Sequence, residues 1–568
     1  MKASETTLRN LLEGGKQFQV PLFQRPYSWK QDNWEILWND LISIYTDEVK
    51  GSYFLGPIVT QAELGTAEGI TPFVVIDGQQ RLTTLSILLA VLRNHLKKSD
   101  KQMSEQIHEF YLINKYQKND DFYKVLPTQG DRDAYKNIID GKATKGKTKE
   151  LVPGQIYEAY KFFDKHLKQP ILDDVLLDLG KLKTIILECL VLVNITSGAD
   201  DNPYLIFESL NNKGEELTQA DLVRNYIFMK LPPTERDEVY NNEWATLQDR
   251  FKAKSGDKPY AEELTNAFWF YLRKDGEAVN QKEVYRGVKK RFDKLKNEES
   301  VKAELRNIIK FADYYKRLNF EEEETNTKLR HWFQRLKRLN FTTCHIFLLN
   351  IYYEYEENRL SIDEFEAILR YLESYFVRRL FAGVSTKSLG TVFNNLYREV
   401  EQENSTNLVD GLCKVLKKYD KSKVWPDDDA FRKGVIENSL YTKSLSDRAK
   451  LILESLEASL TKEKVAPSEL TIEHVMPQTL TKEWKTMLGT NHASIHKKWL
   501  HTTGNLTLTG YNSELSNKPF EEKLVLLSNS NVTLNQYFQK SKVDTWNEEA
   551  IKNRANYLAD IAIKVWPR

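Results

Sequence analysis

Two short apolar segments, separated by an insertion and followed by a helix signal, constrain the fold of this 568-residue chain most. Residues 472–478 read Ile-Glu-His-Val-Met-Pro-Gln, and their apolar start predicts a strand that ends at an acid and a histidine. Residues 506–509 alternate leucine and threonine, which predicts a second strand. Asn517 predicts the N-cap of a helix that starts near Pro519. The segment is therefore expected to fold as strand, loop, strand and helix.

The polar residues at these junctions match the requirements of phosphodiester hydrolysis, which needs an activated water, a cation on the scissile phosphate and a group that aims the base. His474 can take a proton from water near neutral pH, so it is the expected catalytic base. Glu473 can hold Mg²⁺ through a hard oxygen, and Asn512 can give a second oxygen ligand. Asn505 is expected to fix the loop that orients His474. This order of strands, helix, His and Asn is the layout of a ββα-metal nuclease.

The segment resembles the HNH nucleases, and more closely the HNH domain of GmrSD-type modification-dependent restriction enzymes. The resemblance rests on residues 473–478, Glu-His-x-x-Pro-Gln, and on residues 504–508, Gly-Asn-Leu-x-Leu. The family more widely carries Asp or His where this chain has Glu473. The alternative interpretation makes His474 a packed core histidine and the asparagines turn residues, which suits a lone histidine better than this ordered set.

Composition and length bound the class of protein. The length predicts about three or four domains, and 41% hydrophobic with 29% charged residues is ordinary for a soluble globular protein. No apolar run reaches the roughly 18 residues of a membrane span, and the N-terminus lacks a signal-peptide pattern, so a cytoplasmic protein is expected. Three widely spaced cysteines without a CxxC pair favour a reducing compartment and argue against a thiolate zinc site. A net charge of +1 leaves any DNA contact to local basic patches.

Histidine is concentrated in the nuclease segment, which holds four of the nine in the chain. Three of them, His492, His496 and His501, lie in the insertion between the two predicted strands. We expect these three to be surface residues and assign no zinc to them.

A second candidate site lies near the N-terminus, where an apolar strand is predicted over residues 71–76 and an apolar helix follows residues 77–81. A strand that ends in a glycine turn and opens a helix places free N–H groups and a positive dipole end at one point, which is a natural phosphate cradle. Asp77 can hold a cation, and Arg81 can neutralise charge on a transferring phosphoryl group. Gln79 or Gln80 could position a water.

Residues 77–81, Asp-Gly-Gln-Gln-Arg, and residues 24–29, Gln-Arg-Pro-Tyr-Ser-Trp, resemble the DGQQR-motif domain of GmrSD-type proteins. The core of that domain is similar to the ParB/sulfiredoxin nucleotide-binding fold. The resemblance implies NTP binding and hydrolysis, with a pocket made by Gln24, Arg25, Asp77, Gly78, Gln79, Gln80 and Arg81. The alternative is that Arg25 and Arg81 are structural ion-pair residues.

Residues 141–148 match the P-loop pattern GxxxxGK[ST] letter for letter. A working P-loop needs a buried strand before it and a helix after it, whereas residues 133–140 resemble the end of a helix capped by Gly141. We therefore expect a flexible solvated loop there. Glu208, Asn211 and Asn212 stand in a further family-like pattern, and they either line the nucleotide pocket or form a structural turn.

The chain is thus predicted to be α+β and multidomain. Residues 1–240 are expected to form a ParB/sulfiredoxin-like NTP-binding and sensor domain, 241–455 a helical coupling domain, and 456–568 an HNH endonuclease domain. Residues 376–380, Phe-Val-Arg-Arg-Leu, and 424–426, Val-Trp-Pro, also fit the GmrSD-like pattern, so the resemblance covers nearly the whole chain.

The resemblance implies an NTP-regulated, Mg²⁺-dependent endonuclease that restricts modified phage DNA. Its partners would be NTP, as substrate or effector, and double-stranded DNA that carries glucosylated hydroxymethylcytosine or phosphorothioate. A homodimer is a possible assembly. The alternative is an NTP-dependent DNA-binding or signalling protein whose HNH fold is only a binding module.

Overall fold

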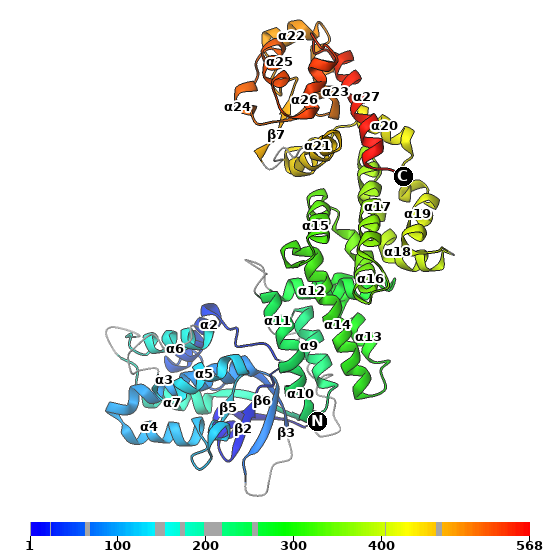
Figure 1. Cartoon of the computed structure of the whole chain (residues 1–568). Helices are drawn as coiled ribbons and strands as arrows, with labels where there is room; N and C mark the ends of the chain where they lie inside the picture. The colour runs from blue at the N-terminus through cyan, green and yellow to red at the C-terminus, as the bar shows by residue number, and fades with distance from the viewer. Residues whose placement is uncertain are drawn as a thin grey trace. The chain divides into compact units, whose positions relative to one another are not determined.

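The computed structural model describes residues 2–22, 24–62, 69–142, 154–170, 176–197, 218–252, 260–403, 405–461 and 469–568. The chain forms two compact units: unit 1 is Met1–Glu262 with Tyr285–Leu305, and unit 2 is Glu263–Val284 with Arg306–Arg568. It is mixed α and β, mostly helical and multidomain, which confirms the predicted class (Figure 1). These units do not separate residues 306–455 from 456–568, so the division into three domains stays a prediction.

Unit 1 is built on a six-stranded mixed sheet with the strand order β1-β6-β3-β4-β2-β5. Antiparallel pairing joins β1 to β6 and β3 to β4, and parallel pairing joins β6 to β3, β4 to β2 and β2 to β5. The predicted strand over residues 71–76 is β4. The strands are β1 (Lys2–Thr7), β2 (Lys16–Gln19), β3 (Tyr53–Ala62), β4 (Thr71–Asp77), β5 (Val125–Leu126) and β6 (Leu190–Ser197).

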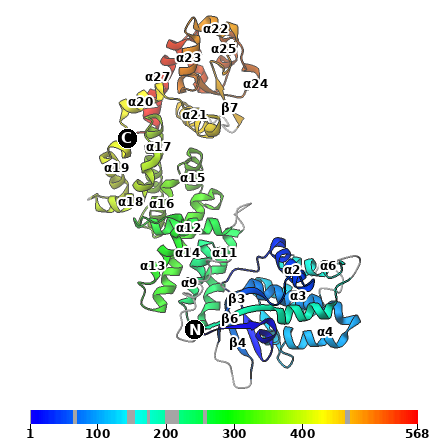
Figure 2. The ribbon, with the colours of Figure 1, turned by 180° about the vertical axis from the view of Figure 1, so that it is seen from behind.

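The central helix of unit 1 is α3, in which every residue from 82 to 92 is buried. A helix that is buried on all sides must be covered on all sides, and Figures 1 and 2 show α3 beside the sheet and among neighbouring helices of the same unit. Other described helices of this unit are α1 (Leu8–Leu12), α2 (Gln31–Tyr45), α4 (Lys101–Ile107), α5 (Gln129–Ile139), α6 (Gln155–His166), α7 (Leu179–Thr184), α9 (Gln219–Met229), α10 (Pro233–Val239), α11 (Ala245–Lys252) and α13 (Val284–Phe292), while α3 itself is Gln79–Ser99.

The loop with the P-loop pattern begins where the sequence predicts. Helix α5 ends at Ile139, and Gly141 follows with a positive φ of 71° and an N–H that donates to the carbonyl of Ile138. The predicted helix end and glycine cap are confirmed. Residues 143–148 of the pattern, and likewise Glu208, Asn211 and Asn212, lie outside the described residues.

Unit 2 holds a helical part and a short two-stranded sheet. The two family-like patterns of the helical part lie against each other, because Arg378 Nη1 donates to Pro426 O and Arg379 Nη1 donates to Val424 O. The helices are α12 (Tyr260–Arg273) and α14 (Glu298–Asn319), which cross the unit boundary as α13 does at Val284, and α15 (Thr327–Leu339), α16 (His345–Glu356), α17 (Ile362–Phe381), α18 (Leu389–Gln402), α19 (Leu408–Lys418), α20 (Asp428–Glu437), α21 (Ser446–Leu460), α22 (Lys482–Leu488), α23 (His492–Trp499), α24 (Asn512–Leu515), α25 (Phe520–Ser528), α26 (Thr533–Lys540) and α27 (Glu548–Val565).

The predicted strand, loop, strand and helix of the nuclease segment are present. Strand β7 (Thr471–His474) pairs antiparallel with β8 (Leu506–Thr509), and α25 begins one residue after Pro519. The predicted N-cap at Asn517 is wrong, because Pro519 takes the cap position. Proline sets φ near the helical value, and the carbonyl of Pro519 accepts the first bonds of the helix, so the cap lies two residues later than expected while the helix starts close to the predicted place.

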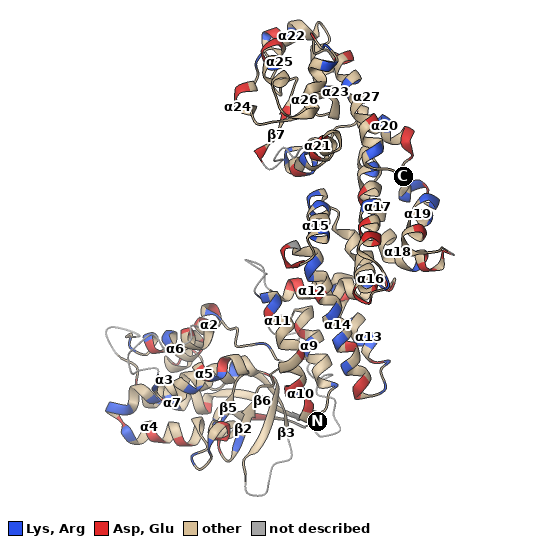
Figure 3. Ribbon diagram, in the orientation of Figure 1, with Lys and Arg blue, Asp and Glu red and all other residues tan. Residues whose placement is uncertain are grey.

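Charge and membrane features of the described chain agree with the sequence. Figure 3 shows basic and acidic residues interspersed along the helices of both units, and the 82 Lys and Arg residues nearly balance the 81 Asp and Glu residues. None of the described helices has the length and the apolar character needed to cross a membrane. The three cysteines are free thiols.

Candidate active site

The histidine that ends β7 is held by another histidine. His474 Nε2 lies 3.0 Å from His501 Nδ1, and the Tyr441 ring meets the His474 ring edge to face at 4.9 Å between centroids. His474 is only 5% exposed, and burial, with the nearby His501 second, lowers its pKa to about 3. The imidazole is therefore neutral at physiological pH. Within the described chain its Nδ1 has no hydrogen-bond partner, so Nδ1 is the nitrogen that can take a proton.

His501 is the residue that sequence reasoning missed. It was expected on the surface, and that expectation is wrong because its ring bonds His474 and stacks on Tyr441 at 5.5 Å. Its carbonyl also accepts the N–H of Leu440 at 2.8 Å. No spacing rule marks this histidine in the sequence, because the contact joins an insertion to a strand that ends 27 residues earlier.

His496 also makes a defined contact, because its Nε2 lies 3.0 Å from the carbonyl oxygen of Pro477.

Asn505 closes the loop beside β7 with four hydrogen bonds of its side-chain amide, which we call the Asn505 clamp. Its Oδ1 accepts the N–H of Met476 at 2.7 Å and the indole N–H of Trp546 at 2.9 Å. Its Nδ2 donates to the carbonyls of Met476 at 3.0 Å and Leu500 at 2.9 Å. The side chain is fully buried. Asn505 thus fixes the backbone two residues beyond His474, the geometry expected of a residue that orients the base.

Gly504 is required by the helix that packs on this loop. A Cβ at Gly504 would lie 2.4 Å from the carbonyl oxygen of Ile551 in α27, which is far inside van der Waals contact. Arg554 of the same helix donates to the carbonyls of Gly504 at 2.9 Å and Leu506 at 2.7 Å. The loop between the strands is therefore pinned by a helix that lies about fifty residues later in the sequence.

Glu473 forms a buried ion pair. Lys523 Nζ lies 2.5 Å from Glu473 Oε1 and donates to the carbonyl of His474 at 3.0 Å. Burial raises the pKa of Glu473 and lowers that of Lys523, and each partner opposes the shift of the other. The pair attaches α25 to the end of β7. Lys523 thus stabilises both the carboxylate and the backbone of the expected base.

Asn512 is exposed at the start of α24 and reaches β7 through its Nδ2, which donates to the carbonyl of Ile472 at 3.4 Å. Its amide oxygen is therefore turned away from that bond. A carboxylate at Glu473 and an amide oxygen at Asn512 are hard donors that suit Mg²⁺, which keeps several waters and uses one or two protein carboxylates. No cluster of three or more His, Cys, Asp or Glu side chains in the described residues could hold a metal ion, and the Glu473 carboxylate is already paired with Lys523.

The N-terminal site has the strand, turn and helix that the sequence predicts. Strand β4 ends at Asp77, Gly78 follows with a φ of 89°, and α3 begins at Gln79. A Cβ at Gly78 would lie 3.0 Å from Pro57 O and from Ile58 Cγ1, so both the conformation and the space demand glycine. The N-cap Gly78 has no side chain to cap the first turn of α3. Among the described residues, the first N–H groups of the helix therefore have no side-chain acceptor.

Arg81 is fixed beside this turn. Its Nη1 donates to the carbonyl of Pro57, and its Nη2 lies 3.9 Å from Asp77 Oδ2. Gly56, with a φ of 115°, gives the guanidinium its room, because a Cβ there would stand 3.0 Å from Arg81 Nη1. Both members of the ion pair are about one-fifth exposed, 20% for Arg81 and 21% for Asp77, so each can still meet a ligand.

The glutamines of this site join the segment at 24–29 to β4 and α3. Gln24 Nε2 donates to the carbonyls of Val75 at 2.7 Å and Ile76 at 3.1 Å. Gln80 Oε1 accepts the N–H of Ser28 at 2.8 Å, and Gln80 Nε2 donates to Pro26 O at 3.3 Å. Gln79 Nε2 donates to the carbonyl of the partly exposed Arg25 at 3.2 Å. These amides hold the two motifs together, so the structure brings all seven candidate residues to one place.

Two comparisons with known families coincide with these sites. Residues 8–228 match the N-terminal domain of the GmrSD restriction endonuclease, and residues 425–561 match the C-terminal domain of GmrSD restriction endonucleases. The first range contains the Asp77–Arg81 turn, and the second contains β7, β8 and the histidine pair. The chain belongs to the GmrSD family of restriction endonucleases. A search of curated proteins finds no match to the chain.

Proposed function

We propose that this protein is an HNH-type DNA endonuclease that uses Mg²⁺ to cut modified foreign DNA and is regulated by an NTP. The observation that carries the proposal is the way His474 is held: its Nε2 lies against His501, Lys523 donates to its carbonyl and Asn505 fixes the next turn. A neutral histidine with one free nitrogen at the end of a strand is suited to take a proton from water. Family membership supports DNA as the substrate.

The residues around His474 would contribute to cutting by holding the His474 ring in place. A donor bond from His474 Nε2 to His501 Nδ1 leaves the Nδ1 lone pair of His474 as the base. The negative charge of a scissile phosphate beside the ring would raise the lowered pKa of His474 toward the working range. Glu473 and Asn512 are the residues that would hold Mg²⁺, which when bound stabilises charge on the phosphate.

His474→Ala tests the nuclease. In a plasmid-nicking assay with Mg²⁺ and with EDTA, we expect the variant to lose about 10²–10⁴-fold in rate, the usual cost of removing a general base. His492→Ala is the matched control, because this histidine lies in the same unit at the start of α23 and makes no hydrogen bond or ring contact with His474 or His501 in the described structure. Cutting by His474→Ala at the wild-type rate would refute the HNH assignment, whereas no cutting by the wild type with Mg²⁺ would favour the DNA-binding alternative.

The nucleotide site is proposed at the Asp77–Arg81 turn. The uncapped start of α3, the left-handed turn at Gly78 and the guanidinium of Arg81 form an arrangement that suits an NTP phosphate. Asp77→Ala or Arg81→Ala should remove most NTP turnover, whereas Lys147→Ala should change it little. The opposite pattern would move the nucleotide site to the P-loop-like segment.

Regulation by NTP requires linkage between the two sites. If NTP controls cutting, DNA and nucleotide must change each other's affinity by the same factor. We expect modified duplex, carrying glucosylated hydroxymethylcytosine or phosphorothioate, to change nucleotide affinity when both are measured on His474→Ala so that the DNA survives. Equal nucleotide affinities with and without DNA, together with cutting that ignores NTP, would contradict regulation.

A further inference from the structure

A small pocket in the helical part of unit 2 has an unbalanced positive charge. It has a volume of about 240 Å³ and lies where α17 ends, α18 begins and α21 begins. Its wall is apolar and aromatic, with Phe341 stacked on Phe376 at 4.5 Å between centroids. Two of its nine lining residues are arginines, Arg379 and Arg448, and no Asp or Glu is among these described lining residues.

Arg379 is bonded but not neutralised. It is 3% exposed, and its guanidinium donates to the carbonyls of Val424, Ser385 and Ser422 at 2.8 to 2.9 Å. Burial lowers its pKa. The preceding Arg378 shows the contrast, because its Nη2 lies 2.7 Å from Asp428 Oδ1. Arg379 makes no ion pair with a carboxylate in the described chain, so its positive charge stays uncompensated.

Unlike Arg379, Arg448 donates no hydrogen bond to a carbonyl oxygen of the described residues. It lies in the first turn of α21, is half-buried, and its Nε is buried without a hydrogen-bond partner among the described residues. Burial lowers its pKa too, with no neighbouring carboxylate to oppose the shift. The N-cap of α21, Leu445, offers no side-chain bond to the first-turn N–H groups. Burying unpaired charge is costly, so a fold that keeps Arg448 here needs another reason for it.

We propose that this pocket binds a phosphate group through Arg448 and Arg379. The planar guanidinium fork matches the geometry of a phosphate, and the charge-assisted bonds would satisfy the buried Nε. The phosphate belongs either to the DNA backbone or to a free nucleotide, because both carry the same group. The aromatic wall would face the sugar or base next to it.

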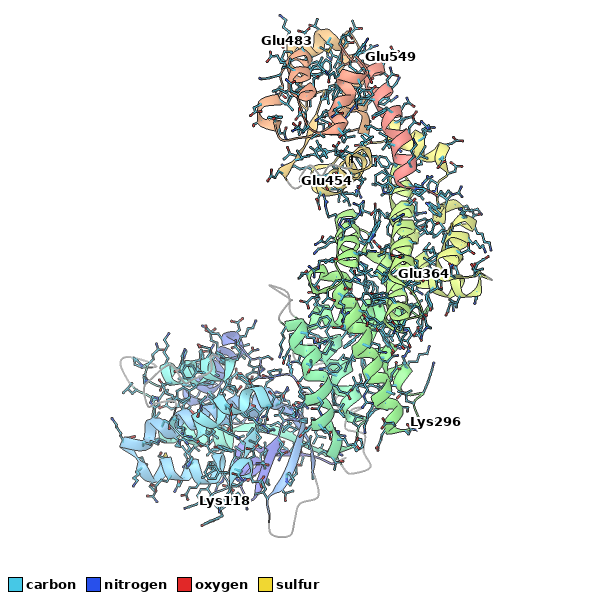
Figure 4. All side chains as sticks on the ribbon, in the orientation of Figure 1. Lys118, Lys296, Glu364, Glu454, Glu483 and Glu549 are labelled. Carbon is cyan, nitrogen blue, oxygen red and sulfur yellow. The ribbon has the colours of Figure 1, made fainter. Side chains whose placement is uncertain are left out.

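Arg448→Gln tests the proposal on the full chain with His474→Ala, which keeps DNA intact. If the phosphate is that of DNA, the slope of log affinity against log salt should fall by about 0.9, and binding at low salt should weaken about tenfold. Lys450→Gln is the matched control, since it removes the same charge from the same helix but does not line the pocket. Lys450 lies 3.7 Å from Glu454, which Figure 4 labels on α21.

Free phosphate is tested by thermal unfolding with inorganic phosphate and with a 5′-mononucleotide. The test is made on an Arg81→Ala background, which removes phosphate binding at the Asp77–Arg81 turn. If the ligand is free, both compounds should raise the melting temperature of Arg81→Ala and of Arg81→Ala/Lys450→Gln but not of Arg81→Ala/Arg448→Gln. Without ligand, Arg448→Gln should melt no lower than the wild type, because it removes an uncompensated charge.

Two results would overturn the proposal: unchanged salt slope together with unchanged phosphate stabilisation, or a lower ligand-free melting temperature with normal DNA binding. Arg448→Lys, which keeps the charge and loses the fork, should show a partial defect even if Arg448→Gln fails to fold.

Discussion

The Asn505 clamp gives a prediction whose size follows from the structure. Asn505→Ala removes the acceptor of two buried donors, the Met476 N–H and the Trp546 indole N–H. A buried donor left unpaired costs about 1–3 kcal/mol, so two such donors cost about 4 kcal/mol. That is a large part of the roughly 5–15 kcal/mol that stabilises a domain. We therefore expect Asn505→Ala to open the end of β7 locally and to reduce cutting as a consequence.

Hydrogen exchange measures this opening where it occurs. Since about 1.4 kcal/mol is a factor of ten, a loss of about 4 kcal/mol should speed exchange of peptides that span 471–476 by about a thousandfold. Peptides of unit 1 serve as the internal reference. Asn556→Ala is the matched control, because Asn556 is exposed on α27 and only donates to the Lys552 carbonyl, so its loss should change stability by about 0.5 kcal/mol or less.

A second variant separates the two halves of the amide. Asn505→Asp keeps the acceptor for Met476 but turns an oxygen toward the carbonyls of Met476 and Leu500, so it should also destabilise β7. Normal exchange of residues 471–476 in Asn505→Ala, alongside lost cutting, would refute the clamp and assign Asn505 a direct role in the chemistry.

His501→Leu should lower kcat by about 10²-fold with little change in KM, because it removes the ring that positions His474. His501→Asn can keep an acceptor near the Nδ1 position, so it should recover most of the rate. Equal rates for the two variants would show that His501 does not position His474. Lys523→Met should lower the free energy of unfolding by about 3–5 kcal/mol, because it leaves Glu473 as a lone buried carboxylate, and adding Glu473→Gln should restore most of it in denaturant unfolding. Burial lowers the pKa of His108 from 6.5 to about 4, so the unfolded chain binds a proton at a higher pH than the folded chain does. The free energy of unfolding should therefore fall as the pH drops from about 6.5 to about 4. Thermal unfolding across this range should show a smaller drop in melting temperature for His108→Gln than for the wild type.

The sequence was sufficient for features that depend on local pattern. The alternating leucines and threonines of 506–509, the apolar run of 71–76 and the glycine after α5 all took the predicted conformations. Each depends on the periodicity of side chains or on the conformational freedom of glycine, which neighbours in sequence determine. The motif residues of both sites were recognised because they are contiguous in the chain.

The contacts that hold those residues in place could not be predicted from the sequence. The bond between His474 and His501 and the buried pair of Glu473 and Lys523 join positions 27 and 50 residues apart. Strand β1 was not predicted either, since Lys-Ala-Ser-Glu-Thr-Thr has little apolar character and becomes a strand by pairing with β6. In each case tertiary packing determines which residue or strand is the partner, and local sequence propensity does not predict it.

Helix α27 bears on when the nuclease site can form during synthesis. Its Arg554 and the preceding Trp546 complete the loop at Gly504 and Asn505, yet they are translated long after β7 and β8. While a ribosome is still adding residues 510–545, helix α27 does not yet cover the loop between β7 and β8, and Asn505 makes only some of its hydrogen bonds. A chain that stops anywhere before Trp546 therefore carries the motif without the assembled site. Premature termination would yield fragments without the completed loop, so the site is assembled only on a chain that has been translated as far as Arg554.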